Sequence, residues 1–242
     1  MKKTILLAMA ILTGSAVASA DSGVVNNPDN HAFFGARVSV DASIPGDLKF
    51  GNEKMSVFNP GAGVSLGLIY QQPVVANFYV QPGVEFYYDT QKYDLGNSTL
   101  ANSMMKSHSS RSFGMRVPVM LGYHFDFTPN FKLEVFTGPV LKVGFSDDYY
   151  LTTDTEIAGA EAVRFHTSGS MYKDNPFTGA GLSNAYNRVD CAWRIGIGAN
   201  FCRNYYVGLS GDLGMVNQIK HSNNGAYDQK NNLFQFTLGY NF

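Results

Sequence analysis

The sequence is poor in charge, in cysteine and in long apolar runs. Charged residues make up 15% of the 242 residues and the formal net charge is −1, so the chain lacks the basic excess expected of a nucleic-acid-binding protein. Beyond the first twenty residues, no apolar stretch approaches the ~20 residues that a membrane-spanning helix needs. A mature protein that resides in a membrane must therefore cross it with strands.

The two cysteines, Cys191 and Cys202, do not suit a disulfide within the chain. The segment between them has the pattern of one strand, and ~3.3 Å per residue would separate their Cα atoms by roughly 36 Å. A disulfide requires a separation of ~5.5 Å. We predict two free thiols.

The N-terminus has the three-part layout of a secretory signal peptide. Lys2 and Lys3 precede an apolar run, and Ala18-Ser19-Ala20 supplies the small residues of a cleavage site. We expect residues 1–20 to be a signal peptide, residues 21–30 to be a disordered polar stretch, and residues 31–242 to form the exported domain.

The exported domain alternates apolar and polar residues with a period of two, as strands with one apolar face and one polar face do. In the last strand, Phe234, Phe236 and Leu238 share one face while Gln235 and Thr237 share the other. Eight segments follow this pattern: 32–40, 61–70, 77–88, 111–124, 131–145, 189–201, 205–216 and 233–242. Pro82 and Pro118 fall inside two of them and predict bulges or edges.

The links between these segments alternate long and short without exception. Links 41–60, 89–110, 146–188 and 217–232 are long and polar, whereas 71–76, 125–130 and 202–204 are short. An up-and-down transmembrane barrel places all long links at one rim, as extracellular loops, and all short links at the other, as periplasmic turns. The sequence therefore predicts an all-β fold, an eight-stranded antiparallel up-and-down β-barrel in the cell outer membrane.

The third long link leaves an alternative open. Residues 149–157 and 162–167 could form a hairpin above the membrane or two further strands, which would make ten. Their acidic and polar composition favours the hairpin. The 146–188 loop is also the largest candidate surface for a ligand, because loops on a rigid scaffold commonly carry binding.

Aromatic residues gather at the strand ends, where amphipathic rings suit the membrane interface. The terminal Phe242, with Tyr240 two residues before it, resembles the aromatic ending by which the barrel-assembly machinery recognises outer-membrane barrels. We expect these two residues to serve assembly, and the outer-membrane lipid and the assembly machinery to be partners.

Charged residues on the polar faces are expected to form cross-strand pairs, since an isolated charge inside a barrel is costly. Counting from the turns and loops pairs Arg194 with Asp212, Glu85 with Arg116, and Lys142 with Asp190. Eight strands enclose barely enough space for side chains, so the interior is expected to be closed rather than a pore.

Signs of catalysis are sparse. His124 is the only histidine on a predicted strand, and it falls at the short-turn end, away from the outer leaflet that lipid-modifying barrel enzymes serve. The other histidines lack the clustered spacing of a metal site. We expect no cofactor and no enzymatic activity.

Short motifs resemble the PorT-like outer-membrane β-barrel family of the Gram-negative Bacteroidota. They are Arg116-Val-Pro-Val-Met-Leu-Gly-Tyr-His-Phe, Phe136-Thr-Gly-Pro, and the glycine-rich pair 190–198 and 205–214. The resemblance implies an outer-membrane barrel and permits a role as an accessory subunit of a protein secretion system. The expected function is a structural or surface-recognition role, with the secretion subunit and a lipid-modifying enzyme as alternatives.

Overall fold

The computed structural model describes residues 31–46, 48–50, 53–55, 59–92, 105–155, 163–173, 186–202, 204–219 and 227–242. The expected signal peptide (1–20) and the expected disordered stretch (21–30) lie outside these residues. In the described part of the chain, no helix is long and apolar enough to cross a membrane.

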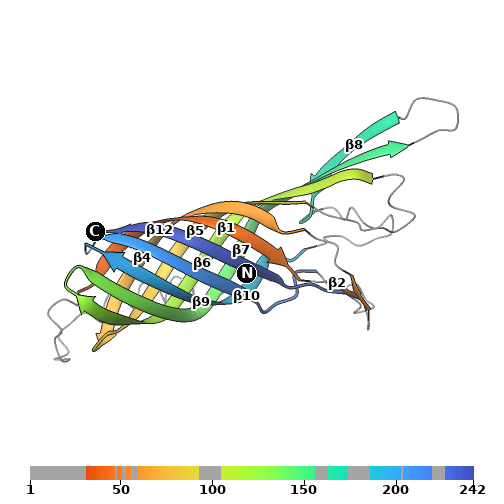
Figure 1. The fold of residues 1–242 in the computed structure, drawn as a ribbon. Coiled ribbons are helices and arrows are strands. Elements are labelled where there is room, and N and C mark those ends of the chain that lie inside the picture. Colours follow the sequence, from red (N-terminus) through yellow and green to blue (C-terminus); the bar gives the residue numbers. More distant parts are fainter. Residues whose placement is uncertain are drawn as a thin grey trace.

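Eight antiparallel strands form a closed ring (Figure 1). Each pairs with its neighbours in chain order, β6 also pairs with β7, and β12 closes the ring against β1. The expected eight-stranded up-and-down barrel is confirmed. The strands are β1 (Phe33–Pro45), β4 (Gly61–Val75), β5 (Phe78–Lys92), β6 (Met105–Thr128), β7 (Phe131–Thr155), β9 (Val189–Phe201), β10 (Tyr205–Gly214) and β12 (Asn231–Asn241).

The apolar faces of the strands point outward and the polar faces point inward. Phe34 and Leu68 are 64% and 66% exposed, whereas Arg37 and Gln235 are 6% and 1% exposed. This is the reverse of a soluble sandwich, and it follows directly from the period-two pattern once the ring closes.

Inward aromatic rings fill the barrel by lying over glycines of neighbouring strands. A Cβ at Gly122 would lie 2.1 Å from Cζ of Tyr79, and one at Gly196 would lie 2.3 Å from Cζ of Phe136. Tyr206 covers Gly198 in the same way. The glycines therefore provide the space into which the large interior side chains pack.

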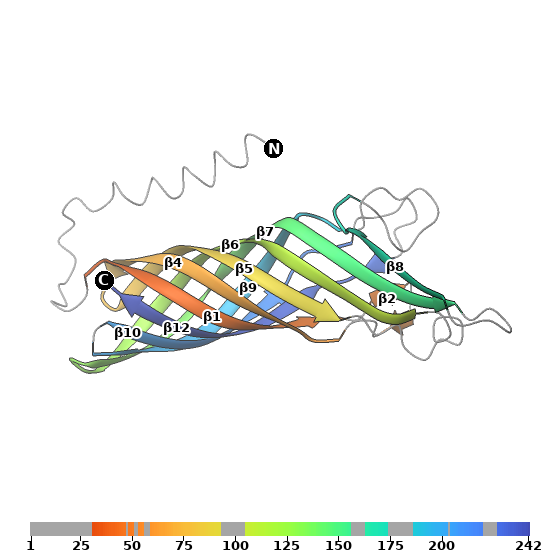
Figure 2. The same ribbon diagram turned by 90° about the horizontal axis from the view of Figure 1, so that it is seen from above.

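The short links form tight turns at one rim of the barrel (Figure 2). Two turn residues, Ala76 and Cys202, have positive φ angles of 49° and 50°. The Cys202 backbone N–H donates to the Asn130 carbonyl at 2.8 Å, which joins two neighbouring turns. The long links lie at the other rim, as the sequence predicts.

The third long link contains a hairpin, not two further wall strands. β7 continues to Thr155 and pairs there with β8 (Val163–Ser170), which pairs with no other described strand. Together with the upper part of β6 they project beyond the barrel, so the ten-strand alternative is wrong (Figure 1). A small second sheet joins β2 (Leu48–Phe50) to β3 (Glu53–Met55) and β11 (Tyr227–Asp228).

Both cysteines are free thiols, as predicted. Cys191 lies in β9 and Cys202 in the turn that follows this strand. The intervening strand keeps the two sulfur atoms apart.

Candidate functional site: the polar interior of the barrel

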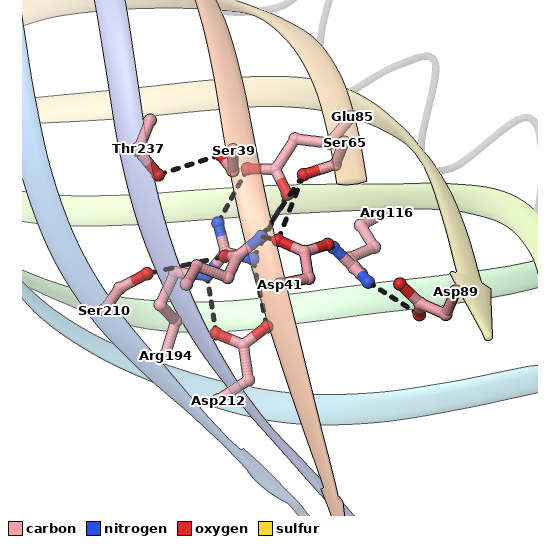
Figure 3. A network of polar contacts seen from close by, with 11 residues as sticks. Ser39, Asp41, Ser65, Glu85, Asp89, Arg116, Arg194, Ser210, Asp212 and Thr237 are labelled. Carbon is pink, nitrogen blue, oxygen red and sulfur yellow. Dashed lines mark hydrogen bonds and ion pairs between the residues drawn. The ribbon is translucent and has the colours of Figure 1, made fainter. Parts of the chain in front are cut away.

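Arg194 on β9 is the centre of one ion-pair cluster (Figure 3). Its Nε donates to Oδ1 of Asp212 at 2.6 Å, and its Nη1 donates to Oε1 of Glu85 at 2.7 Å. Arg194 and Asp212 also lie opposite each other in the β9–β10 register, as expected from the sequence. All three side chains are buried, so each charge has an opposite charge that compensates part of its desolvation.

Arg116 on β6 is the centre of a second cluster. Its two terminal nitrogens donate to Asp41 at 2.7 Å and to Asp89 at 3.0 Å. The guanidinium also lies over the Tyr87 ring, 4.4 Å from the ring centre. Arg116 is only 1% exposed, and these three contacts surround it.

Gln235 on β12 extends the second cluster along the wall. Its Nε2 donates to Oδ1 of Asp41 at 3.0 Å, and the Ser65 hydroxyl donates to the same oxygen at 3.3 Å. The Ser210 hydroxyl donates to the Gln235 carbonyl oxygen at 3.4 Å. The network therefore runs through the interior from β4 to β10 (Figure 3).

Two of the expected pairs adopt other partners. Glu85 and Arg116 are opposite in register, yet Glu85 pairs with Arg194 and Arg116 with Asp41 and Asp89. The physical reason is the narrow bore, because long side chains that point toward the barrel axis reach strands beyond their neighbours.

Lys142 and Asp190 are also opposite in register, but their contacts differ. The Lys142 ammonium lies 4.6 Å from the centre of the Tyr87 ring. The Asp190 carboxylate accepts from Gln218 Nε2 at 3.0 Å and from the Cys191 backbone N–H at 2.7 Å. The expected direct ion pair is replaced by these contacts.

A third polar cluster lies toward the short turns. His124 Nε2 is 2.7 Å from Gln71 Nε2, and His124 Nδ1 is 3.5 Å from Oε2 of Glu134. The His124 ring stacks on Tyr79 with a centroid separation of 4.4 Å. Nε2 contacts the Gln71 amide, Nδ1 is buried without a hydrogen-bond partner among the described residues, and the ring stacks on Tyr79, so the geometry supports a structural role for His124.

The end with the long links is partly covered by a tyrosine-rich cluster. Tyr149, Met171, Tyr172 and Tyr186 pack together, and Met171 is fully buried. Beneath them is a cavity of about 40 Å³, large enough for only a few water molecules. Its polar lining includes Lys142, Asp147 and Arg188.

Within the described residues, no three His, Cys, Asp or Glu side chains are placed so that they could hold a metal ion. Four further interior charges are absent from the expected pairs, namely Arg37, Asp41, Asp89 and Glu134. Arg37 and Glu134 lie on the polar faces of predicted strands, whereas Asp41 and Asp89 fall in the predicted links 41–60 and 89–110, although each continues the inward alternation of the strand before it.

The expected assembly residues end β12. Phe242 is 72% exposed, and its backbone N–H donates to the Phe34 carbonyl at 2.8 Å, which holds the C-terminus against β1. Its ring is 5.3 Å from that of Tyr240, which in turn lies 5.6 Å from Tyr205. The role of Phe242 and Tyr240 in assembly stays a prediction.

A closed antiparallel ring with an apolar exterior, a charged interior and loops sorted by rim defines an outer-membrane β-barrel protein. The chain belongs to the outer membrane protein beta-barrel domain family, whose family model matches residues 26–220. It is therefore located in the cell outer membrane. The assignment of the short turns to the periplasmic side and of the long links to the extracellular side stays a prediction. The narrower resemblance to PorT-like barrels stays a prediction.

Several solved outer-membrane proteins have a similar arrangement. Ail of Yersinia pestis, in complex with the heparin analogue sucrose octasulfate, is 10% identical, with 88% of this chain and 100% of that chain covered and a TM-score of 0.41. OprG of Pseudomonas aeruginosa is 12% identical, with 88% and 98% covered and a TM-score of 0.44. Neisserial surface protein A is 9% identical, with 88% and 98% covered and a TM-score of 0.38. No curated protein matches the chain.

Proposed function

We propose that this protein is a non-enzymatic outer-membrane scaffold with a closed interior, whose extracellular extension of β6, β7 and β8 recognises a ligand at the cell surface. The observation that carries the proposal is the continuation of two wall strands as a paired sheet beyond the membrane. A sheet continuous with the barrel wall presents its surface away from the membrane, where a ligand can reach it.

The interior supports the closed state. Arg116 and Arg194 each hold two carboxylates across the bore, and their side chains are 2% and 6% exposed. Two small cavities border these clusters, of about 40 and 20 Å³. A conducting pore would need the charged side chains to leave their partners, which costs several kcal/mol per unpaired buried ion.

Deleting residues 154–185 tests the recognition role. The deletion removes β8 and its connections but keeps every strand of the ring, so the heat-modifiable migration of the folded barrel on a gel should persist. Loss of cell adhesion to a panel of host-matrix and glycan surfaces, with the barrel intact, is the expected result. Unchanged adhesion would reject recognition by this extension.

Conductance tests the closed interior separately. The purified protein in planar bilayers should give no stable open channels, whereas frequent ion-selective openings would contradict the proposal. An accessory role in secretion would instead be indicated by stoichiometric co-purification of a periplasmic or outer-membrane partner. Lipid turnover abolished by His124→Ala would contradict the non-enzymatic role.

A further inference from the structure

Three neighbouring ladders of the barrel wall are interrupted. The β4–β5 pairing skips from Ile69–Gly83 to Gln72–Val80, and the β5–β6 pairing skips from Pro82–Val119 to Glu85–Arg116. The β6–β7 pairing skips from Pro118–Val140 to Leu121–Thr137. The remaining five ladders of the ring run without a break at any depth.

The interruptions join into one band across half of the wall. In β5, residues 81–82 lack pairing with β4 and the next two, 83–84, lack pairing with β6. In β6, residues 117–118 lack pairing with β5 and the next two, 119–120, lack pairing with β7. We call this the interrupted band, formed by residues 70–71, 81–84, 117–120 and 138–139. It crosses the strands rather than separating two of them, because each ladder is paired again above and below it.

Proline explains the gaps. Pro82, Pro118 and Pro139 each lie beside one interruption, and proline has no N–H to donate to the ladder. At the last gap, a Cβ at Gly138 would lie 2.1 Å from the Val119 carbonyl oxygen, so only glycine fits before Pro139. Each of the three ladders therefore lacks one hydrogen-bond donor here, while its register is the same on both sides of the gap.

The interior behind the band is apolar. Ile69, Met120 and Val140 point inward and are 5%, 4% and 1% exposed. Hydrophobic packing is non-directional, so these contacts resist bending less than a polar network would. Gln71, at the edge of the band, contacts His124 at 2.7 Å, and the contacts of Ile69, Met120 and Val140 are hydrophobic packing.

Directly above the band, two ion pairs connect the interrupted half to the continuous half. Glu85 on β5 pairs with Arg194 on β9, and Arg116 on β6 pairs with Asp41 on β1. Neither pair joins neighbouring strands of the ring. Both cross the bore at the level where β5 and β6 resume their pairing.

We propose that the interrupted band is a hinge in the barrel wall, and that the Glu85–Arg194 and Arg116–Asp41 ion pairs hold it in the straight position. β5 and β6 lie inside the band, and β6 continues into the extracellular extension (Figure 2). Bending at the band moves the upper part of β6 and the extension attached to it relative to the membrane, while β7 stays paired with β9 up to Val143 and β10, β12 and β1 stay fixed. The hinge depends on the wall alone and holds whether or not the extension binds a ligand.

Residue-resolved amide hydrogen exchange of the protein in lipid nanodiscs tests the hinge. Amides of Tyr70, Gly83 and Val119, which lie opposite Pro82, Pro118 and Pro139 in the register, should exchange about fivefold faster or more than those of the paired Ile195 and Gly211 on the continuous side, the factor expected for one lost hydrogen bond. Equal exchange on the two sides would overturn the proposal.

Substitutions separate the hinge from its ion pairs. Glu85→Gln should speed exchange further in β5 and β6 but not in β10 or β12. Ser39→Ala is the matched control, because it removes a 2.8 Å hydrogen bond to Thr237 between two neighbouring strands of the continuous half. An equal effect of both substitutions would overturn the role of the cross-bore pair.

Pro118→Val restores a donor to the β5–β6 ladder and should slow exchange there by about the same factor. This variant keeps the proposal testable if Glu85→Gln fails to insert. Unchanged or faster exchange around residue 118 would show that the missing N–H is not the cause.

Discussion

At the scale of single residues, the interior is built from buried ion pairs and from aromatic rings that pack over glycines. Arg116 and Arg194 each receive two carboxylates, so the cost of burying a guanidinium is offset by ion pairs with good geometry. The remaining volume is filled by rings that lie over glycines. A change of one methyl group at such a glycine should therefore be felt in stability.

Gly122→Ala should destabilise the barrel by about 1–3 kcal/mol, because its Cβ would overlap the Tyr79 ring. Gly211→Ala is the control, since the nearest heavy atom to its added Cβ would be 3.8 Å away. The measurement is the urea midpoint of refolded protein in detergent. Similar midpoints for both variants would show that ring-over-glycine packing does not limit stability.

Asp147 should make stability depend on pH. Asp147 lies two residues beyond Phe145, whose ring contacts Phe113 in the outer aromatic girdle. Burial raises the pKa of Asp147 from 3.8 to about 7, and nearby Lys142 opposes this shift. Because the folded-state pKa is raised, the stabilisation is complete below pH 3.8 and is lost as the pH rises through about 7. Between these limits the free energy of unfolding should fall by at most roughly 1.4 kcal/mol for each step of one in pH.

Asp147→Asn should remove this decline between about pH 4 and pH 7. Asp148→Asn makes the same charge change one residue further on and should keep most of the decline, because burial raises the pKa of Asp147 more than the nearby Asp148 does. Urea midpoints across this pH range measure both. A decline that survives in Asp147→Asn would assign the effect to another group.

At the scale of elements, strand length separates wall from extension. β6 and β7 have 24 and 25 residues, whereas β9 and β10 have 13 and 10. The excess length of β6 and β7 lies at the rim of the long links, where β8 joins them.

The turn after β9 should be reachable only from the periplasm. Cys202 is exposed in that turn, and Cys191→Ala leaves it as the single thiol. A membrane-impermeant maleimide should label this variant in permeabilised cells and not in intact cells. Labelling in intact cells would place the short turns outside and invert the topology.

At the scale of the whole molecule, closure of the ring depends on the contact between its first and last strands. β12 pairs with β1 without interruption, and the final residue still donates a backbone hydrogen bond to Phe34. The exposed ring of Phe242 extends the periplasmic aromatic girdle. It is therefore placed where an assembly factor could contact it before closure.

Phe242→Ala should lower the yield of inserted protein several-fold, measured as the heat-modifiable fraction in outer-membrane preparations. Phe201→Ala removes another exposed aromatic at the same rim and should have a smaller effect. Equal losses would mean that the girdle as a whole, and not the terminal residue, guides insertion.

Much of the architecture follows from the order of residues alone. The alternation of Phe34, Ala36 and Val38 with Arg37 and Ser39 sets which side chains face lipid, because successive Cβ atoms in a strand point to opposite faces. The alternation of long and short links sets the topology. The short turn between β9 and β10 also sets the register that places Arg194 opposite Asp212.

Only the closed ring decided which charges meet across the bore. Glu85 is 109 residues from Arg194, and Asp41 is 75 residues from Arg116. Counting residues from a turn predicts only which residues of neighbouring strands lie opposite each other. These contacts join strands that are not neighbours, so they depend on the diameter and curvature of the barrel. The sequence thus determined the faces, the strands and the local register, while the tertiary structure decided the partners of the buried charges and aligned three prolines from separate strands into one band.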